Sequence, residues 1–170
     1  MRRPINIQTR QRGFTFIELL IGLVIMGILF MVGFANYRGF ASRQNIEAVV
    51  REMKGDLRLA QQMATSGVKS SDPASSCHAI DKELQGYVVR GTSATSYAVY
   101  ANCDGENLVK EVNLSEKYPN ITLSDFEFTF LPLAGGITWS GPDRIDIDEV
   151  VGGASIESRQ IIVTAAGQIN

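Results

Sequence analysis

The feature that most constrains this chain is an apolar run from Phe14 to Ala35. It is almost unbroken hydrocarbon, and its length matches the about 20 residues that a helix needs to cross the core of a bilayer. One residue is out of place, because Glu18 carries a carboxylate near the start of the run. An acidic residue at the centre of a spanning helix costs about 2.5–3.5 kcal/mol, and less near an end. An ionisable group inside a spanning segment therefore predicts a functional role.

A short polar leader precedes the apolar run. It contains Arg2, Arg3, Arg10 and Arg12 and no acidic residue. Positive charge ahead of a spanning segment holds that end in the cytoplasm. We therefore expect a single-pass protein of the inner membrane, with its N-terminus cytoplasmic and the residues after the run in the periplasm.

The leader and the start of the run together resemble a known signal. The residues Gly13-Phe14-Thr15-Phe16-Ile17-Glu18, placed after a basic leader, are similar to the prepilin signature of type IV pilins and type II secretion pseudopilins. The resemblance implies that a prepilin peptidase cuts between Gly13 and Phe14 and methylates the new amino group of Phe14. It also implies that Glu18, at the fifth mature position, is an assembly residue that pairs with this amino group on its own or a neighbouring chain.

Two other interpretations of the run remain open. A simple membrane anchor explains the apolar residues and the arginines, but it leaves Glu18 incidental. A secretory signal peptide explains the basic start, and Gly33-Phe34-Ala35 offers a small-x-small cleavage site. The apolar region of a signal peptide usually has about 7–15 residues, whereas this run is longer and contains an acid.

The charge balance bears on possible partners. Removal of residues 1–13 would leave 12 basic residues against 18 acidic ones, a formal net charge of −6. Nucleic-acid binding needs clustered cations that displace counterions from phosphates. A branch of the resembling family binds DNA through basic residues near its C-terminus, but this chain ends in Gly167-Gln168-Ile169-Asn170, with Arg159 the nearest cation. We expect no nucleic-acid partner.

The helical pattern continues beyond the apolar run. Apolar residues recur at spacings of three and four, which indicates one buried face of an amphipathic helix: Ile46, Val49, Val50, Met53, Leu57, Ala60 and Met63. Ser66-Gly67 marks its end, because glycine can take the left-handed conformation that closes a helix. We predict one helix from Phe14 to Ser66, with a transmembrane half over 14–35 and an amphipathic half over 36–66.

After Gly67 the apolar residues no longer recur at helical spacing. Residues 67–83 are polar and rich in turn formers, and predict a loop. Short strands are predicted at residues 87–89, 97–100, 108–109, 126–130, 145–148 and 161–164. Because strands so close together leave no room for intervening helices, the sheet should be mainly antiparallel. The sequence therefore predicts an α+β protein, a long N-terminal helix followed by a β-rich head over 67–170.

This order of elements resembles one branch of the pilin superfamily in particular, the H-type minor pseudopilins. Three segments carry the likeness: Leu57-Arg58-Leu59-Ala60-Gln61-Gln62, an aromatic strand that runs into Leu131-Pro132 and Gly135-Gly136, and Ile161-Ile162-Val163 before Gly167-Gln168-Ile169. Gln61 stands where an arginine is common in the family. The resemblance implies a pilin-like head behind the helix.

The two cysteines, Cys77 and Cys103, both follow the apolar run. In an oxidising compartment such an isolated pair is usually a disulfide, which contributes about 2–4 kcal/mol. Two unpaired buried thiols are the alternative. Neither cysteine has the Cys-x-x-Cys spacing of a redox or zinc site.

No pattern in the sequence indicates catalysis. His78, the one histidine, has no recognisable partners for acid–base or nucleophilic chemistry. Asp143, Asp146, Asp148 and Glu149 gather oxygens but lack the spacing of a calcium loop, and we expect a solvated strand face. We expect no catalytic residues, metal or cofactor.

The sequence thus predicts a structural subunit rather than an enzyme. The interpretation is a minor pilin or pseudopilin of a type II secretion pseudopilus or a type IV pilus, whose partners are the prepilin peptidase, the inner membrane and other pilin subunits. The alternative is an exported, membrane-anchored β-rich binding domain unrelated to filaments.

Overall fold

The first element is a single long helix. The computed structural model describes residues 13–69, 76–78, 81–133 and 136–170, and the helix α1 spans Phe16–Ser66. The basic leader at residues 1–12, parts of the predicted loop at 70–75 and 79–80, and Gly135 lie outside the described residues. The chain forms two compact units, Met1–Phe40 and Ala41–Asn170.

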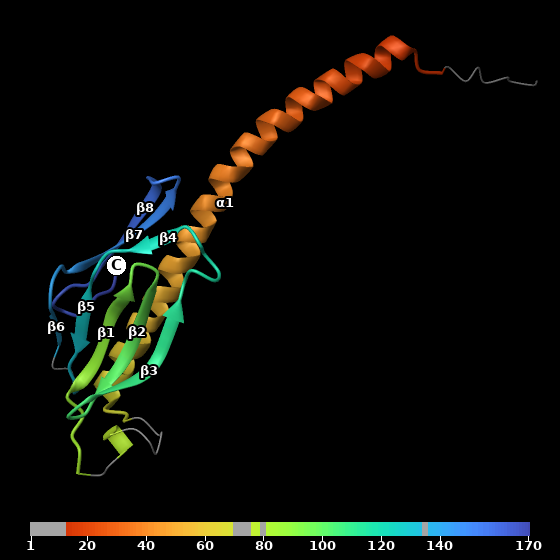
Figure 1. Ribbon diagram of the computed structural model, residues 1–170. Helices are drawn as coiled ribbons and strands as arrows, with labels where there is room; N and C mark the ends of the chain where they lie inside the picture. The colour runs from red at the N-terminus through yellow and green to blue at the C-terminus, as the bar shows by residue number, and fades with distance from the viewer. Residues whose placement is uncertain (1–12, 70–75, 79–80, 134–135) are drawn as a thin grey trace, which may run out of the picture. The chain divides into compact units, whose positions relative to one another are not determined.

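Eight strands form two antiparallel sheets in the second unit. The five-stranded sheet has the order β3-β2-β1-β5-β6, and Figure 1 shows β1, β2 and β3 side by side. Its strands are β1 (Gly86–Ser93), β2 (Ser96–Asn102), β3 (Glu106–Asn113), β5 (Glu127–Phe130) and β6 (Ile137–Trp139). The three-stranded sheet has the order β4-β7-β8, with β4 (Ile121–Leu123), β7 (Arg144–Val151) and β8 (Ala154–Ile162). A short 3-10 turn, η1 (Ser76–His78), precedes β1.

All strand pairs are antiparallel, so the predicted α+β class and antiparallel pairing are confirmed. The two sheets are joined where the chain passes from β4 to β5. There the amide of Ser124 donates to the carbonyl oxygen of Asp146 at 2.9 Å, and the Ser124 hydroxyl accepts a bond from the amide of Asp146. These bonds hold β4 and its continuation against β7.

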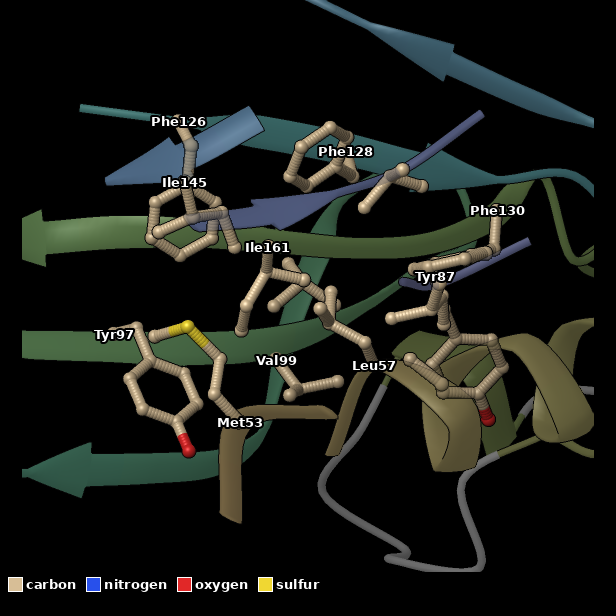
Figure 2. Close-up of a cluster of buried hydrophobic side chains, with 14 of the residues drawn as sticks. Met53, Leu57, Tyr87, Tyr97, Val99, Phe126, Phe128, Phe130, Ile145 and Ile161 are labelled. Carbon is tan, nitrogen blue, oxygen red and sulfur yellow. The ribbon is translucent and has the colours of Figure 1, made fainter. Parts of the chain in front are cut away.

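The core lies between the second half of α1 and the inner faces of both sheets. In Figure 2, Met53 and Leu57 of α1 point toward Tyr97, Val99 and Tyr87 of the five-stranded sheet and toward Ile161 of β8. The predicted face of the helix is buried from Ile46 to Ala60, while Met63 is partly buried and Ala64 completes the stripe. The strict alternation of Phe126, Phe128 and Phe130 places all three rings inside, as the sequence predicts.

The helix ends where the sequence predicts. Gly67 has a φ of 64°, and its amide donates to Ala64 O, while the amide of Val68 donates to Met63 O. This pair of bonds satisfies carbonyl groups that the last turn leaves without helical partners.

Three strand predictions were incomplete. The short strands β4 and β6 were missed, and β8 begins at Ala154 rather than at Ile161. Residues 154–160 are mostly polar because this strand lies at a sheet edge with one face exposed. A usable signal was present, since Gly152-Gly153 links β7 to β8 as a two-residue turn with φ of 64° and 84°, the geometry that favours paired glycines in hairpins.

Candidate assembly and processing site

The apolar segment has no contacts that bury it within the described chain. Residues Phe16–Gly33 have a mean hydropathy of 2.6, and the large side chains of this stretch are between 48% exposed at Leu20 and 81% exposed at Phe16. The helix is long and apolar enough to cross a membrane. Within the described residues nothing covers its hydrocarbon surface.

The predicted cleavage site lies immediately before the helix. Gly13 and Phe14 are exposed and have no helical hydrogen bonding, and α1 begins at Phe16, two residues later than predicted. The reason is the cap at Thr15, whose carbonyl oxygen accepts bonds from the amides of Glu18 at 3.1 Å and Leu19 at 3.2 Å. The peptide bond between Gly13 and Phe14 thus lies in exposed chain before the helix.

Glu18 occupies the third position of the helix. The Thr15 hydroxyl accepts a bond of 3.4 Å from the amide of Glu18, so Thr15-Phe16-Ile17-Glu18 has the spacing of a capping box. A carboxylate in the first turn also interacts favourably with the positive end of the helix dipole. The sequence analysis missed this local role, although the Thr-x-x-Glu spacing that signals it is visible in the sequence.

The capping geometry leaves the charge of Glu18 unneutralised. Within the residues that the structure describes, Glu18 forms no ion pair. In the uncut chain the nitrogen of Phe14 is a neutral amide, so cleavage after Gly13 is the step that would create a cation close to Glu18 in sequence. One face of the same helix end forms a shallow apolar groove lined by Ile17, Leu20, Ile21, Val24 and Ile25.

The second unit contains a buried carboxylate whose charge is matched internally. Asp56 on α1 is 7% exposed and accepts a bond of 2.8 Å from the Tyr97 hydroxyl, while Lys110 Nζ lies 2.7 Å from its Oδ1. Burial raises the pKa of Tyr97 well above its ordinary value, and the hydrogen bond to Asp56 raises it further. This cluster ties the helix to β2 and β3.

The acidic residues near β7 do not share one solvated face, so that prediction was wrong for Glu149. Its side chain continues the inward row of Ile145 and Ile147, is 5% exposed, and accepts a hydrogen bond from the hydroxyl of Ser42 on α1. The unbroken alternation of β7 places it there, because residues 145, 147 and 149 lie on the same buried face of the strand. Within the described residues, no group of three or more His, Cys, Asp or Glu side chains comes together to hold a metal.

A disulfide joins Cys77 of η1 to Cys103, with a Cα–Cα distance of 5.1 Å. It fastens the segment after α1 to the turn between β2 and β3. His78 beside it is exposed. The arrangement is structural, because it cross-links two loops rather than presenting a reactive group.

Two segments that the sequence analysis treated separately meet at the other end of the chain. The Gln61 side-chain amide donates a bond of 3.0 Å to the carbonyl oxygen of Gly167. Gly167 has a φ of 81°, and a Cβ atom there would lie 2.5 Å from Gln61 Nε2. The C-terminal residues then return to β8, where Asn170 and Ile162 exchange backbone bonds.

Comparison with known proteins identifies the N-terminal segment. Residues 8–34 match the prokaryotic N-terminal methylation motif family, a span that contains Gly13, Phe14 and Glu18. The chain is 26% identical over 107 residues to the type IV major pilin protein PilE of Neisseria gonorrhoeae, covering 62% of this chain and 64% of that one. The motif and this likeness support the resemblance of the chain to the type IV pilin superfamily.

A second relative extends the likeness into the head. The fimbrial protein of Neisseria meningitidis is 24% identical over 161 residues, covering 91% of this chain and 94% of its own. No solved structure gives a significant match to the chain. The methylation motif and the exposed apolar helix together support membrane anchoring through the N-terminal segment.

Proposed function

We propose that this chain is a structural subunit of a pilus or pseudopilus, and not an enzyme. The observation that carries the proposal is the N-terminal methylation motif placed directly before a helix whose apolar surface nothing in the described chain covers. The two Neisseria relatives are named as a type IV major pilin protein and a fimbrial protein. A filament built from such helices would cover this surface with the helices of neighbouring subunits.

Processing would prepare the subunit for assembly. Residues 1–13 are the leader that a prepilin peptidase removes, and Phe14 becomes the N-methylated first residue. Removal turns the neutral amide of Phe14 into a cation within one helical turn of Glu18 in sequence. Residues 14–35 are the transmembrane half of the helix, residues 36–66 its amphipathic half, and residues 67–170 the periplasmic head. The arginine-rich leader supports a cytoplasmic N-terminus in the inner membrane.

Glu18 would then act in assembly as the counter-charge of a Phe14 amino group. In lipid or among apolar helices an isolated charge is unfavourable, whereas a matched pair with satisfied hydrogen bonds is tolerated. The pair would contribute more to the register between neighbouring helices than to raw stability. This role is additional to the capping role that the position of Glu18 provides.

At a finer level, we propose a minor subunit of the H-type branch, serving a type II secretion pseudopilus or a type IV pilus. The bond from Gln61 to Gly167 supports this, because it unites the helix segment and the C-terminal segment on which that resemblance rests. Gly167 could not be replaced there without displacing Gln61.

The experiment separates the charge of Glu18 from its capping role. Four variants are compared for incorporation into sheared filaments: Glu18→Leu, Glu18→Gln, Glu18→Asp and Thr15→Val. Glutamine retains the side chain that suits a capping box but has no charge, whereas Thr15→Val removes the capping hydroxyl and leaves the charge. Leader cleavage and membrane level are measured in parallel as controls.

We expect Glu18→Leu and Glu18→Gln to insert and be cleaved but to fail in assembly, because the Phe14 cation is stranded at a cost of about 3–5 kcal/mol. Glu18→Asp should be intermediate and Thr15→Val should assemble. If Glu18→Gln assembles like the wild type while Thr15→Val does not, Glu18 acts as a cap. If all four assemble normally, Glu18 is not an assembly residue.

N-terminal sequencing of the mature protein tests the filament proposal against the anchored binding domain. A mature chain that starts at Phe14 supports processing by a prepilin peptidase, and Gly13→Leu should block it because the cut requires a small residue. A chain that starts at Asn36 or Met1 would reject the proposal.

A further inference from the structure

The solvent-facing side of the second half of α1 carries three cations that folding does not neutralise. Arg51, Lys54 and Arg58 follow one another at spacings of three and four residues, so they lie on one side of the helix. The two arginines are exposed and the lysine is partly exposed. None of the three forms an ion pair within the described residues. We call these three residues the basic stripe.

The acidic residues on the same half of the helix are, in contrast, matched by cations of the head. Three ion pairs do this: Glu47 with Arg159 at 3.0 Å, Glu52 with Lys117 at 3.7 Å, and Asp56 with Lys110 at 2.7 Å. Folding of the head therefore neutralises the acids of this half of the helix and leaves the charge of the basic stripe facing solvent.

The head has the opposite charge balance. Residues 67–170 contain 14 acidic and 7 basic side chains. Some of these acids are exposed and form no ion pair within the described part of the chain: Asp81, Glu83, Glu111, Glu116, Asp125 and Asp143. The chain thus carries two surfaces of opposite charge that do not meet within one copy.

Gly55 lies among the cations of the basic stripe and leaves the helix bare at this point. Glycine is one of the least favourable residues in the interior of a helix. A Cβ atom at this position would meet nothing within 4 Å, so packing among the described residues does not require a glycine here. The missing side chain would instead let the surface of another molecule approach the helix backbone closely.

An open groove adjoins the basic stripe at Arg51. Its lining includes Gln44 and Asn45 of α1 and Tyr118 from the segment between β3 and β4. The Nε atom of Arg51 donates to the carbonyl oxygen of Glu47 at 3.1 Å, which holds the guanidinium against the helix. Its terminal nitrogens and the amides of Gln44 and Asn45 form no hydrogen bond within the described residues. These donors suit the carboxylate of an entering acidic side chain.

We propose that the basic stripe is a docking surface for the acidic head of a second copy of this chain. Its cations would pair with exposed carboxylates of that head, and Gly55 would allow the close approach. Because the two surfaces differ, the contact is heterologous and can repeat from copy to copy. It therefore suits an open filament better than a closed dimer. This inference rests on the proposed filament function, which brings copies of the chain together.

The test is carbodiimide cross-linking of the full chain in phosphatidylcholine vesicles, followed by mass spectrometry. Carbodiimide joins an amine to a carboxylate in contact with it, so Lys54 reports directly. The variants Arg51→Lys and Arg58→Lys make their positions reactive and keep the charge. Isotope-labelled and unlabelled chains are mixed equally, so that a linked peptide pair of mixed mass identifies a bond between two copies.

Pairs within one copy calibrate the reaction and report folding in every variant. Lys82 lies 2.9 Å from Asp104, and Lys110 lies 2.7 Å from Asp56, so both should give links within a single copy. The matched control is Arg144→Lys on β7. Arg144 is exposed and has no ion pair within the described residues, but it lies outside the basic stripe.

We expect mixed-mass links from positions 51, 54 and 58 to carboxylates of the head, and none from position 144. Replacing Arg51 and Arg58 together by glutamate should reduce the mixed-mass links at Lys54 about tenfold, because each exposed ion pair changes an equilibrium constant by up to about fivefold. Arg144→Glu should leave these links unchanged.

Three results would overturn the docking surface while the calibrating links form normally: no mixed-mass links from the stripe, equal links from position 144, or unchanged links at Lys54 in the double glutamate variant. Incorporation of the same variants into sheared filaments separates this proposal from the filament function. Filaments that take up the double glutamate variant like the wild type reject the docking surface alone. Wild-type chains that link in vesicles but never enter filaments contradict the filament function instead.

Discussion

The two halves of α1 share one secondary structure but differ in everything that surrounds them. In the first half, Phe30 is 80% exposed and no large side chain between Phe16 and Val32 is buried. In the second half, Met53 and Leu57 are 0% exposed beneath the two sheets. Helical hydrogen bonding is the same in both. The second half is therefore stabilised by long-range contacts within its own chain, whereas the first half has no such contacts within the described residues.

The carboxylates of the two halves show the same contrast. Glu18 lies in an apolar stretch and has no ion pair within the described residues, whereas Asp56 lies at a buried position and is matched by Lys110 and Tyr97. Glu47 and Glu52 are likewise paired with Arg159 and Lys117 from the head. An acid on the second half is neutralised when the head folds. Glu18, on the first half, has no oppositely charged partner among the described residues.

The largest expected effect distinguishes buried from exposed leucines on the same helix. Leu57→Ala should lower the free energy of unfolding of the head by about 2–5 kcal/mol, because it leaves a cavity between α1 and the sheets. Leu23→Ala, at a position that is 62% exposed, should leave it unchanged. Urea unfolding of the full chain in detergent, followed by the fluorescence of Trp139, measures both. If both variants lowered the free energy of unfolding equally, the two halves of α1 would not differ in their contribution to the stability of the head.

The disulfide should affect only the second half. Replacing Cys77 and Cys103 together by alanine frees a loop with a sequence separation of 26, and the head should lose about 3.5 kcal/mol. Membrane insertion of the apolar segment should not change. Mass spectrometry of unreduced periplasmic material should find the linked peptides in the wild type. Freely alkylated thiols there, or an unchanged urea midpoint in the double variant, would contradict the assignment.

A smaller effect is expected at the buried hydroxyl of Tyr97. Tyr97→Phe removes its bond to the Asp56 carboxylate and should cost about 1.5–3 kcal/mol, since Lys110 still pairs with Asp56. The folded state raises the pKa of Tyr97 above its ordinary value of 10.0. Its contribution to stability is thus complete below pH 10 and is lost as the pH rises further, because the unfolded chain then binds fewer protons.

Above pH 10 the unfolding free energy of Tyr97→Phe should therefore decrease less steeply with pH than that of the wild type. Urea midpoints at neutral pH and at alkaline pH, with Tyr100→Phe on the same strand as the control, measure the difference. Parallel alkaline profiles for Tyr97→Phe and wild type would show that the proton of Tyr97 is not linked to folding.

Much of the fold could be predicted from local pattern. The three- and four-residue spacing of Ile46, Val49, Met53 and Leu57 predicted the buried face of the helix. The alternation of Phe126, Phe128 and Phe130 predicted the inward face of β5 and of the residue before it. Both patterns work because burial on one side of an element imposes its period on the sequence. The exposed strand β8 was predicted only in part, because an edge strand of mostly polar residues shows little alternation of apolar and polar side chains.

The sequence alone determined the membrane segment, its acid and the motif before it, because these depend on hydrophobicity and spacing along a continuous stretch. Only the tertiary structure decided which residues from distant segments would meet. It paired Asp56 with Lys110, placed the carboxylate of Glu149 beside the hydroxyl of Ser42, and brought Gln61 to Gly167. These outcomes depend on how sheets and helix are registered against one another, and a one-residue change in register reverses the face on which a side chain lies.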